Sequence, residues 1–216
     1  MIAAAILLAL TAMQAPFTGM RPTRQPGQVM LYRDAPCPRG EGNDVLVCSR
    51  PLTVPGARAL RQYAGCVAAR HRTESRALLA LPPETPAARD RMQWLMRQRS
   101  GCAPPGRLSV SAILLQGALA EALVRDRPPR LDPARPLRAR DEADQMGLCL
   151  IAAAPEQVRT LLSSVPGDTA ETDAFAALRP RLDACLSAGL VIRLHPRVLR
   201  AMLALSAYRL SARDEG

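Results

Sequence analysis

The stretches QYAGCVAARHRTESRALLALPP (residues 62–83) and QMGLCLIAAAPEQVRTLLSSVP (residues 145–166) decide the fold, because the second repeats the pattern of the first. Extended in this alignment, residues 62–106 match residues 145–189 at 12 of 45 positions without a gap. The matches include two cysteines, a proline and a glycine, which an alanine- and leucine-rich composition does not align by chance. One inserted residue after Gly189 then places Leu115 on Leu199 and Leu119 on Leu203. A fixed period of this kind indicates that one structural unit is duplicated in tandem.

The apolar residues within each copy follow helical spacing. In the first copy, Leu60, Tyr63, Ala64, Val67 and Ala68 recur at i, i+3, i+4, i+7 and i+8, which places them in one stripe facing a core. The sequence therefore predicts a mainly α-helical fold.

Capping and breaking residues divide each copy into helices. Pro155 suits the first turn of a second helix, and Thr85 and Asp168 suit the N-caps of a third. The fourth helix begins near Ser111 in one copy and near His195 in the other. We expect two tandem copies of a roughly four-helix unit at residues 54–126 and 140–212, with a proline- and arginine-rich linker at 127–139 and a tail at 213–216.

Six cysteines at wide spacing indicate a disulfide framework. They are Cys37, Cys48, Cys66, Cys102, Cys149 and Cys185. Six cysteines allow 15 pairings, but the duplication favours Cys66 with Cys102 and Cys149 with Cys185, which leaves Cys37 for Cys48. Each unit would then have a disulfide from its first helix to the end of its third. The sequence has no C-x-x-C, so we expect no metal and no cofactor.

The first 13 residues, MIAAAILLALTAM, are apolar and uncharged. With the small Ala15 after them, they are typical of the hydrophobic region of a signal peptide at residues 1–15, although no Lys or Arg precedes them. The run is too short to span a bilayer. We expect a periplasmic or secreted protein that is not a transmembrane protein; the alternative is an apolar first helix.

Residues 16–53 differ in composition from the rest. Two β-prone runs, 29–32 and 45–48, flank the turn-rich loop PCPRGEGND (36–44). This pattern predicts a short β-hairpin clipped by a Cys37–Cys48 disulfide.

The segment around this loop also carries a resemblance. Cys37-Pro38 followed by DVLVCSR (44–50) resembles a cysteine-bounded segment of uncharacterised exported proteins of alphaproteobacteria, sphingomonad-like proteins with a duplicated helical cysteine unit. The resemblance implies export. It implies no activity, because that family has none assigned.

The formal net charge of +10 comes from 29 arginines against 19 acidic residues, with no lysine. Arginine suits bidentate contacts to phosphate or carboxylate, so we expect an envelope protein or an anionic glycan or lipid as partner, unless the excess reflects coding bias alone. Aromatic residues make up 3%, which disfavours nucleic acid because stacking platforms are scarce.

Catalytic patterns are absent from the sequence, including G-x-S-x-G, H-E-x-x-H and a G-K-[ST] phosphate loop. We therefore name no catalytic residue and expect a non-enzymatic binding or structural module of the cell envelope. The alternatives are a hydrolase-like enzyme, with His71 or His195 in its site, and a cationic protein that associates with anionic envelope surfaces. Residues that differ between the copies are candidates for a ligand surface, namely Trp94, His71 and Glu121. For Trp94 we favour core filling over exposure as a ligand anchor.

Overall fold

The computed structural model describes residues 29–31, 45–47, 52–83, 85–98, 101–102, 110–125, 137–186 and 192–213. This part of the chain is mainly helical, as predicted, with eight α-helices, one short 3₁₀ helix and three short strands. The helices are α1 (Val54–Arg70), α2 (Arg72–Leu79), α3 (Pro86–Arg97), α4 (Ala112–Arg125), α5 (Glu142–Ala153), α6 (Pro155–Ser163), α7 (Thr169–Leu182), η1 (Asp183–Cys185) and α8 (Pro196–Arg213). The strands are β1 (Val29–Leu31), β2 (Val45–Val47) and β3 (Ile192–Leu194).

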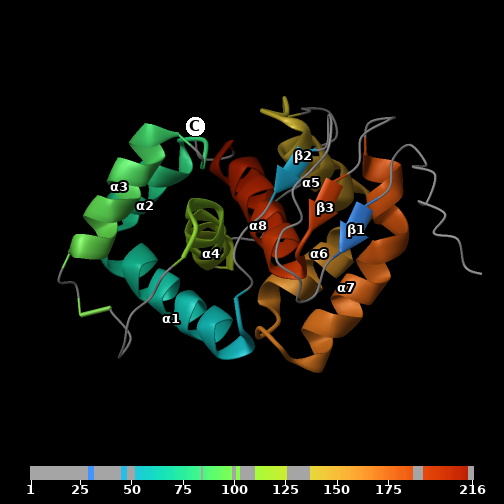
Figure 1. Ribbon diagram of the computed structural model, residues 1–216, viewed down its shortest axis with the longest axis horizontal. Coiled ribbons are helices and arrows are strands. Elements are labelled where there is room, and N and C mark those ends of the chain that lie inside the picture. Colours follow the sequence, from blue (N-terminus) through green and yellow to red (C-terminus); the bar gives the residue numbers. More distant parts are fainter. Residues whose placement is uncertain are drawn as a thin grey trace, which may run out of the picture.

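Helices α4 and α8 lie at the centre, with α1, α2 and α3 on one side and α5, α6 and α7 on the other (Figure 1). The α4–α8 contact is the most extensive between any two elements described. Leu115 and Leu119 of α4 and Leu199 and Leu203 of α8 are almost fully buried in it. The apolar core is therefore continuous across both halves of the chain.

Small residues allow the two central helices to approach closely. A Cβ atom placed on Gly117 of α4 would lie 2.3 Å from the Cβ of Ala201 on α8. A similar limit applies where α5 meets α8, since a Cβ on Gly147 would lie 2.4 Å from the Oγ of Ser206. Glycine at position 117 therefore sets the spacing of α4 and α8, because the clash there involves the Cβ and backbone of Ala201, whereas at position 147 the nearest atom is a side-chain hydroxyl.

The capping predictions are confirmed. The Thr85 hydroxyl accepts a hydrogen bond from the Ala88 N–H at 3.2 Å, and an Asp168 carboxylate oxygen accepts one from the Glu171 N–H at 2.7 Å. Pro155 is the first residue of α6, where its missing N–H is not needed. Gly167, just before the Asp168 cap, has a φ of 84°, a conformation that glycine adopts without steric cost.

Two disulfides join the predicted partners. Cys66 of α1 pairs with Cys102 beyond α3, and Cys149 of α5 pairs with Cys185 in η1, with Cα–Cα distances of 5.5 Å in both. Each bond closes a separation of 36 residues. The first helix of each half is thus held covalently to the end of that half's third helix.

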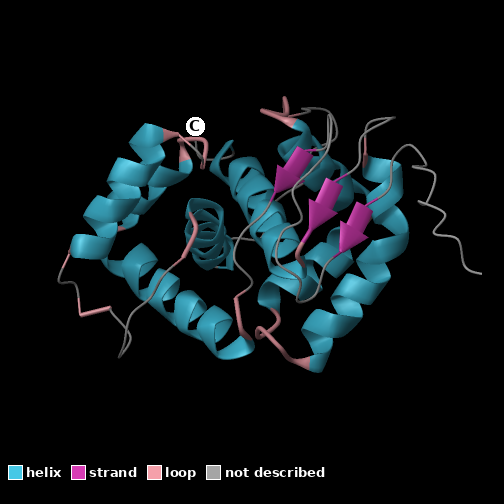
Figure 2. Ribbon diagram, viewed as in Figure 1, coloured by secondary structure: helices cyan, strands magenta, loops and turns pink. Residues whose placement is uncertain are grey.

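The hairpin prediction is wrong. Strands β1 and β2 do not pair with each other, because β3 lies between them and is parallel to both, as Figure 2 shows. Two strands of a hairpin must be antiparallel neighbours. The sequence pattern missed β3, whose three residues lie just before α8.

The other predictions for the beginning of the chain lie outside the described residues, namely the signal peptide at 1–15 and the Cys37–Cys48 disulfide. Most of the linker at 127–139 also lies outside them. Among the helices that are described, none combines the length and the apolar character needed to cross a membrane.

Removing one disulfide should destabilise the fold strongly. In the chain-entropy model a loop of this length contributes about 4 kcal/mol, so a Cys149→Ser/Cys185→Ser variant should lose roughly that much free energy of unfolding. Urea titration followed by circular dichroism measures the loss. An unchanged midpoint would show that the half is held by packing alone.

A methyl group at the helix crossing should also destabilise the protein. Gly117→Ala should lower the free energy of unfolding by about 2 kcal/mol, because α4 and α8 must separate to admit the methyl group. Gly65→Ala is the matched control, since a Cβ there meets nothing within 4 Å. In that helical position alanine should stabilise by about 0.5–1 kcal/mol. Equal effects of the two substitutions would disprove the close approach.

Candidate functional site

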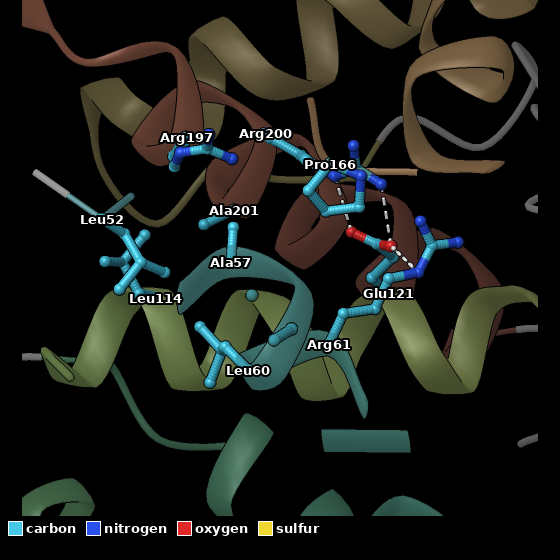
Figure 3. A pocket seen from close by; sticks show the side chains of 12 residues that line it. Leu52, Ala57, Leu60, Arg61, Leu114, Glu121, Pro166, Arg197, Arg200 and Ala201 are labelled. Atoms are coloured by element: carbon cyan, nitrogen blue, oxygen red, sulfur yellow. Dashed lines mark hydrogen bonds and ion pairs between the residues drawn. The ribbon is translucent and has the colours of Figure 1, made fainter. Parts of the chain in front are cut away.

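A buried arginine joins the two halves of the chain. Arg200 of α8 faces Glu121 of α4 (Figure 3). The Arg200 Nε donates to Glu121 Oε2 at 2.8 Å and Nη2 donates to Oε1 at 2.9 Å. This two-point contact fixes the geometry of a charge pair better than a single hydrogen bond does.

The same guanidinium reaches the beginning of α7. Its Nη1 donates to Glu171 Oε1 at 2.8 Å and to the Ser164 Oγ at 3.2 Å, while Nη2 also donates to the Ser164 carbonyl oxygen at 2.8 Å. Arg200, Glu121 and Glu171 each keep only 6% of their surface exposed. Burial of three charges is tolerated because each is paired and hydrogen-bonded.

A second arginine extends the network to α1. Arg61 Nε lies 3.3 Å from Glu121 Oε1, and its other nitrogens donate to the carbonyl oxygens of Ser163 and Ser164. Arg58, one turn earlier, donates to the Pro166 carbonyl oxygen at 2.9 Å. We call Arg61, Glu121, Ser164, Glu171 and Arg200 the Arg200 cluster. It joins α1, α4, α7, α8 and the loop after α6.

The charges of the cluster support one another. Burial alone would lower the pKa of Arg200, but hydrogen bonds and attraction from Glu121 and Glu171 outweigh it, and the pKa is raised. Burial lowers the pKa of Arg61, a lowering that the Glu121 charge opposes. The pKa of Asp168 is lowered, chiefly by the hydrogen bond from the Glu171 N–H. Arg61 and Arg200 thus face Glu121 and Glu171, and the exposed Arg125 adds a further ion pair to Glu121 at 3.4 Å.

The pocket beside the cluster is small. Its volume is about 40 Å³, and Leu60, Leu114 and Ala201 form its apolar wall. Since Arg200 and Glu121 are committed to each other, the cluster can hold helices in place but offers little to a ligand.

A larger groove lies on the other side of Glu171. Its volume is about 750 Å³, and residues of both halves line it, from Leu52, Thr53 and Val54 before and at the start of α1 to Arg179 of α7 and Arg197 of α8. Arg179 is exposed and Arg197 is half-buried. The one carboxylate among the described residues of its lining belongs to Glu171, which already binds Arg200 and the Gly167 N–H. Among the described residues of the lining, arginines therefore outnumber carboxylates.

His195 lines this groove at the beginning of α8. Its Nδ1 accepts a hydrogen bond from the Arg197 N–H at 3.2 Å, and its carbonyl oxygen accepts from Val198 and Leu199. These contacts make His195 the N-terminal cap of α8, which agrees with the predicted start of that helix.

Of the three residues predicted as a ligand surface, the structure brings two together and separates the third. Trp94 and His71 meet edge to face with their ring centroids 6.4 Å apart. Trp94 is 45% exposed, so the expectation that it fills the core is wrong. Glu121 is buried in the Arg200 cluster and forms no part of a surface with them. Its carboxylate lies in the interior because both of its oxygens accept hydrogen bonds from Arg200.

Sequence reasoning missed the Arg200 cluster. Asp168 and Glu171 have the spacing of a capping box, and they do cap α7, but the second role of Glu171 is a tertiary contact. The signal for this contact in the sequence is weak. Arg200 interrupts an otherwise apolar run of consecutive residues in α8, Leu199 to Leu203, and a charge in such a run indicates a buried partner.

Comparison with known proteins gives no relative: no family model matches the chain, and neither does any curated protein or solved structure. Within the described residues there is also no group of three or more His, Cys, Asp or Glu side chains placed to hold a metal ion.

Removing the central arginine should destabilise the fold. Arg200→Met leaves Glu121 and Glu171 buried without their main partner, which costs about 3–5 kcal/mol. Adding Glu121→Gln and Glu171→Gln to that variant should recover part of the loss, because the uncompensated charges are removed. Arg159→Met is the control, since Arg159 and Glu156 form an exposed pair worth about 1 kcal/mol or less. Chemical unfolding compares these variants with the wild type, and equal losses for Arg200 and Arg159 would contradict the buried role.

Proposed function

We propose that the chain is an exported, non-enzymatic helical module made of two copies of a four-helix unit, and that it binds an anionic component of the cell envelope. The alternative from the sequence, a hydrolase-like enzyme, gains no support from the contacts of the two histidines: the ring of His71 meets Trp94, and His195 caps α8.

The helix boundaries support the duplication. Helices α2 and α3 begin at residues 72 and 86, and α6 and α7 begin at residues 155 and 169, which are the positions aligned with them in the repeat. Helix α4 begins at residue 112 and α8 at residue 196, positions that correspond once the inserted residue is counted. The junctions between the first and second helices also correspond, since His71 has φ −128° and ψ 53° and Ala154 has φ −149° and ψ 58°.

The two disulfides support export, because such bonds form and persist in oxidising compartments and are rare in the cytosol. The described core is built mainly of leucine, alanine and valine, which bury less apolar area each than aromatic side chains, so a covalent link is a useful addition to it. The apolar start of the chain fits the same location.

The groove beside α7 carries the proposed function. At about 750 Å³ it is much larger than the pocket beside the Arg200 cluster and has room for a headgroup or a sugar. Arg179 and Arg197 supply positive charge to its lining, and Phe175 adds an aromatic surface. A phosphate or carboxylate group attached to an apolar body fits this lining. Such groups occur on envelope glycans and on lipid headgroups.

Export is tested by mass spectrometry of the full chain, expressed with its own N-terminus and purified without reductant. We expect a protein that lacks about 15 residues from its start and carries disulfides at all six cysteines. An intact first methionine together with free thiols would contradict export.

Binding is tested with purified lipopolysaccharide and, separately, with phosphatidylglycerol vesicles. Arg179→Glu should weaken binding to the preferred component about tenfold, and added salt should weaken binding by the wild type. Arg159→Glu is the control, because it changes the net charge equally on α6, outside the groove. Equal losses in both variants would indicate non-specific attraction and overturn the groove as the site. The component that binds more tightly identifies glycan or lipid as the source of the anionic group.

A further inference from the structure

Gln116 on α4 is a buried polar side chain without a partner in the described part of the chain. It is 1% exposed, and neither its amide oxygen nor its amide nitrogen has a hydrogen-bond partner there. Leaving these groups unpaired costs free energy, roughly 1–3 kcal/mol for each buried group. A leucine at this position would avoid that cost.

Gln116 lines a second pocket of about 80 Å³, twice the volume of the pocket beside the Arg200 cluster. The pocket lies where α4 and α8 meet the beginning of α5 and the end of α2. Leu79, Ile113, Met202 and Leu205 provide its apolar wall. Gln116 is therefore one of the residues around this space, with its amide buried at the wall.

The two pockets occupy corresponding places in the two halves. In the alignment of the copies, Gln116 corresponds to Arg200, Glu121 to Leu205 and Pro83 to Pro166. In one pocket a long arginine reaches a glutamate and fills the space. In the other the corresponding positions hold a shorter glutamine and a leucine, which cannot form a charge pair.

The charged residues of the second pocket balance one another in number, and Asp144 is well hydrogen-bonded. Asp144 accepts hydrogen bonds from Arg209, from the Ser206 hydroxyl at 3.0 Å and from the Arg140 N–H at 2.9 Å. Arg209 also donates to the Arg138 carbonyl oxygen at 3.0 Å. Since two arginines and two aspartates line the pocket, no net charge is left for a charged ligand.

We propose that the Gln116 pocket binds a small neutral ligand group that carries an amide on a short apolar body. An amide offers a carbonyl oxygen and an N–H, which complement the donor and acceptor of the Gln116 side chain. The apolar wall accommodates the hydrocarbon part. This site is separate from the groove, so failure at one leaves the proposal for the other intact.

The test uses nuclear magnetic resonance of the full chain with three probes of equal chain length: butanamide, butanoate and butan-1-ol. The side-chain NH₂ signal of Gln116 is assigned as the one that disappears in Gln116→Leu. We expect butanamide to shift this signal saturably and the other two probes to leave it nearly unchanged.

The backbone signal of Met202, which also lines the pocket, then reports binding in the variants. Gln116→Leu should weaken butanamide binding at least about tenfold, because two hydrogen bonds are lost. Gln93→Leu on the exposed surface of α3 is the control and should bind as the wild type does. If Gln116→Leu fails to fold, Ala143→Leu, which fills the pocket and leaves the Gln116 amide in place, should abolish binding.

Three results would overturn the proposal. No saturable shift with butanamide would mean that the pocket holds water only. Equal shifts with all three probes would mean that the amide is not recognised. Unchanged binding in Gln116→Leu would place the ligand elsewhere.

Discussion

The close contact of Gly117 with Ala201 is the constraint on which the rest of the structure depends. Because α4 and α8 touch through a glycine and an alanine, their backbones come nearer than larger side chains would allow. Glu121 lies one turn after Gly117, and Arg200 directly precedes Ala201. The same approach that joins the helices therefore brings the guanidinium and the carboxylate within hydrogen-bond distance. Wider spacing would leave both charges buried and unpaired, at a cost the fold could not absorb.

The Arg200 cluster and the apolar core stabilise the fold in different ways. A core of leucine, alanine and valine packs in many similar ways, since these side chains fill space without requiring a partner. The Arg200 cluster has directional requirements: one guanidinium must meet two carboxylates and a carbonyl oxygen on three different elements. It selects a single arrangement of the two halves. The disulfides act within each half and place no such requirement on the contact between halves.

Local features of this fold were predictable from the sequence, and contacts between distant elements were not. Helical spacing, the caps at Thr85 and Asp168, and the cysteine pairs follow from residues close in the chain or from the internal repeat. The parallel pairing of β3 with β1 and β2 joins segments near opposite ends of the chain, for which the sequence carries no short-range signal. Glu121 was identified as differing between the copies, but whether it lies on the surface or opposite Arg200 depends on the helix crossing alone.

The proposed duplication accounts for the difference between the two pockets. Gly117 and Ala201 occupy corresponding positions in the sequence alignment and meet each other in the structure, which is the contact expected between two copies of one unit. Each side of that contact then borders an equivalent pocket, but one buried charge network is enough to fix how the halves sit. The Gln116 pocket does not need a charge network to position the halves. Its buried glutamine lowers the stability of the fold, and a polar side chain that lowers stability is typical of a binding site.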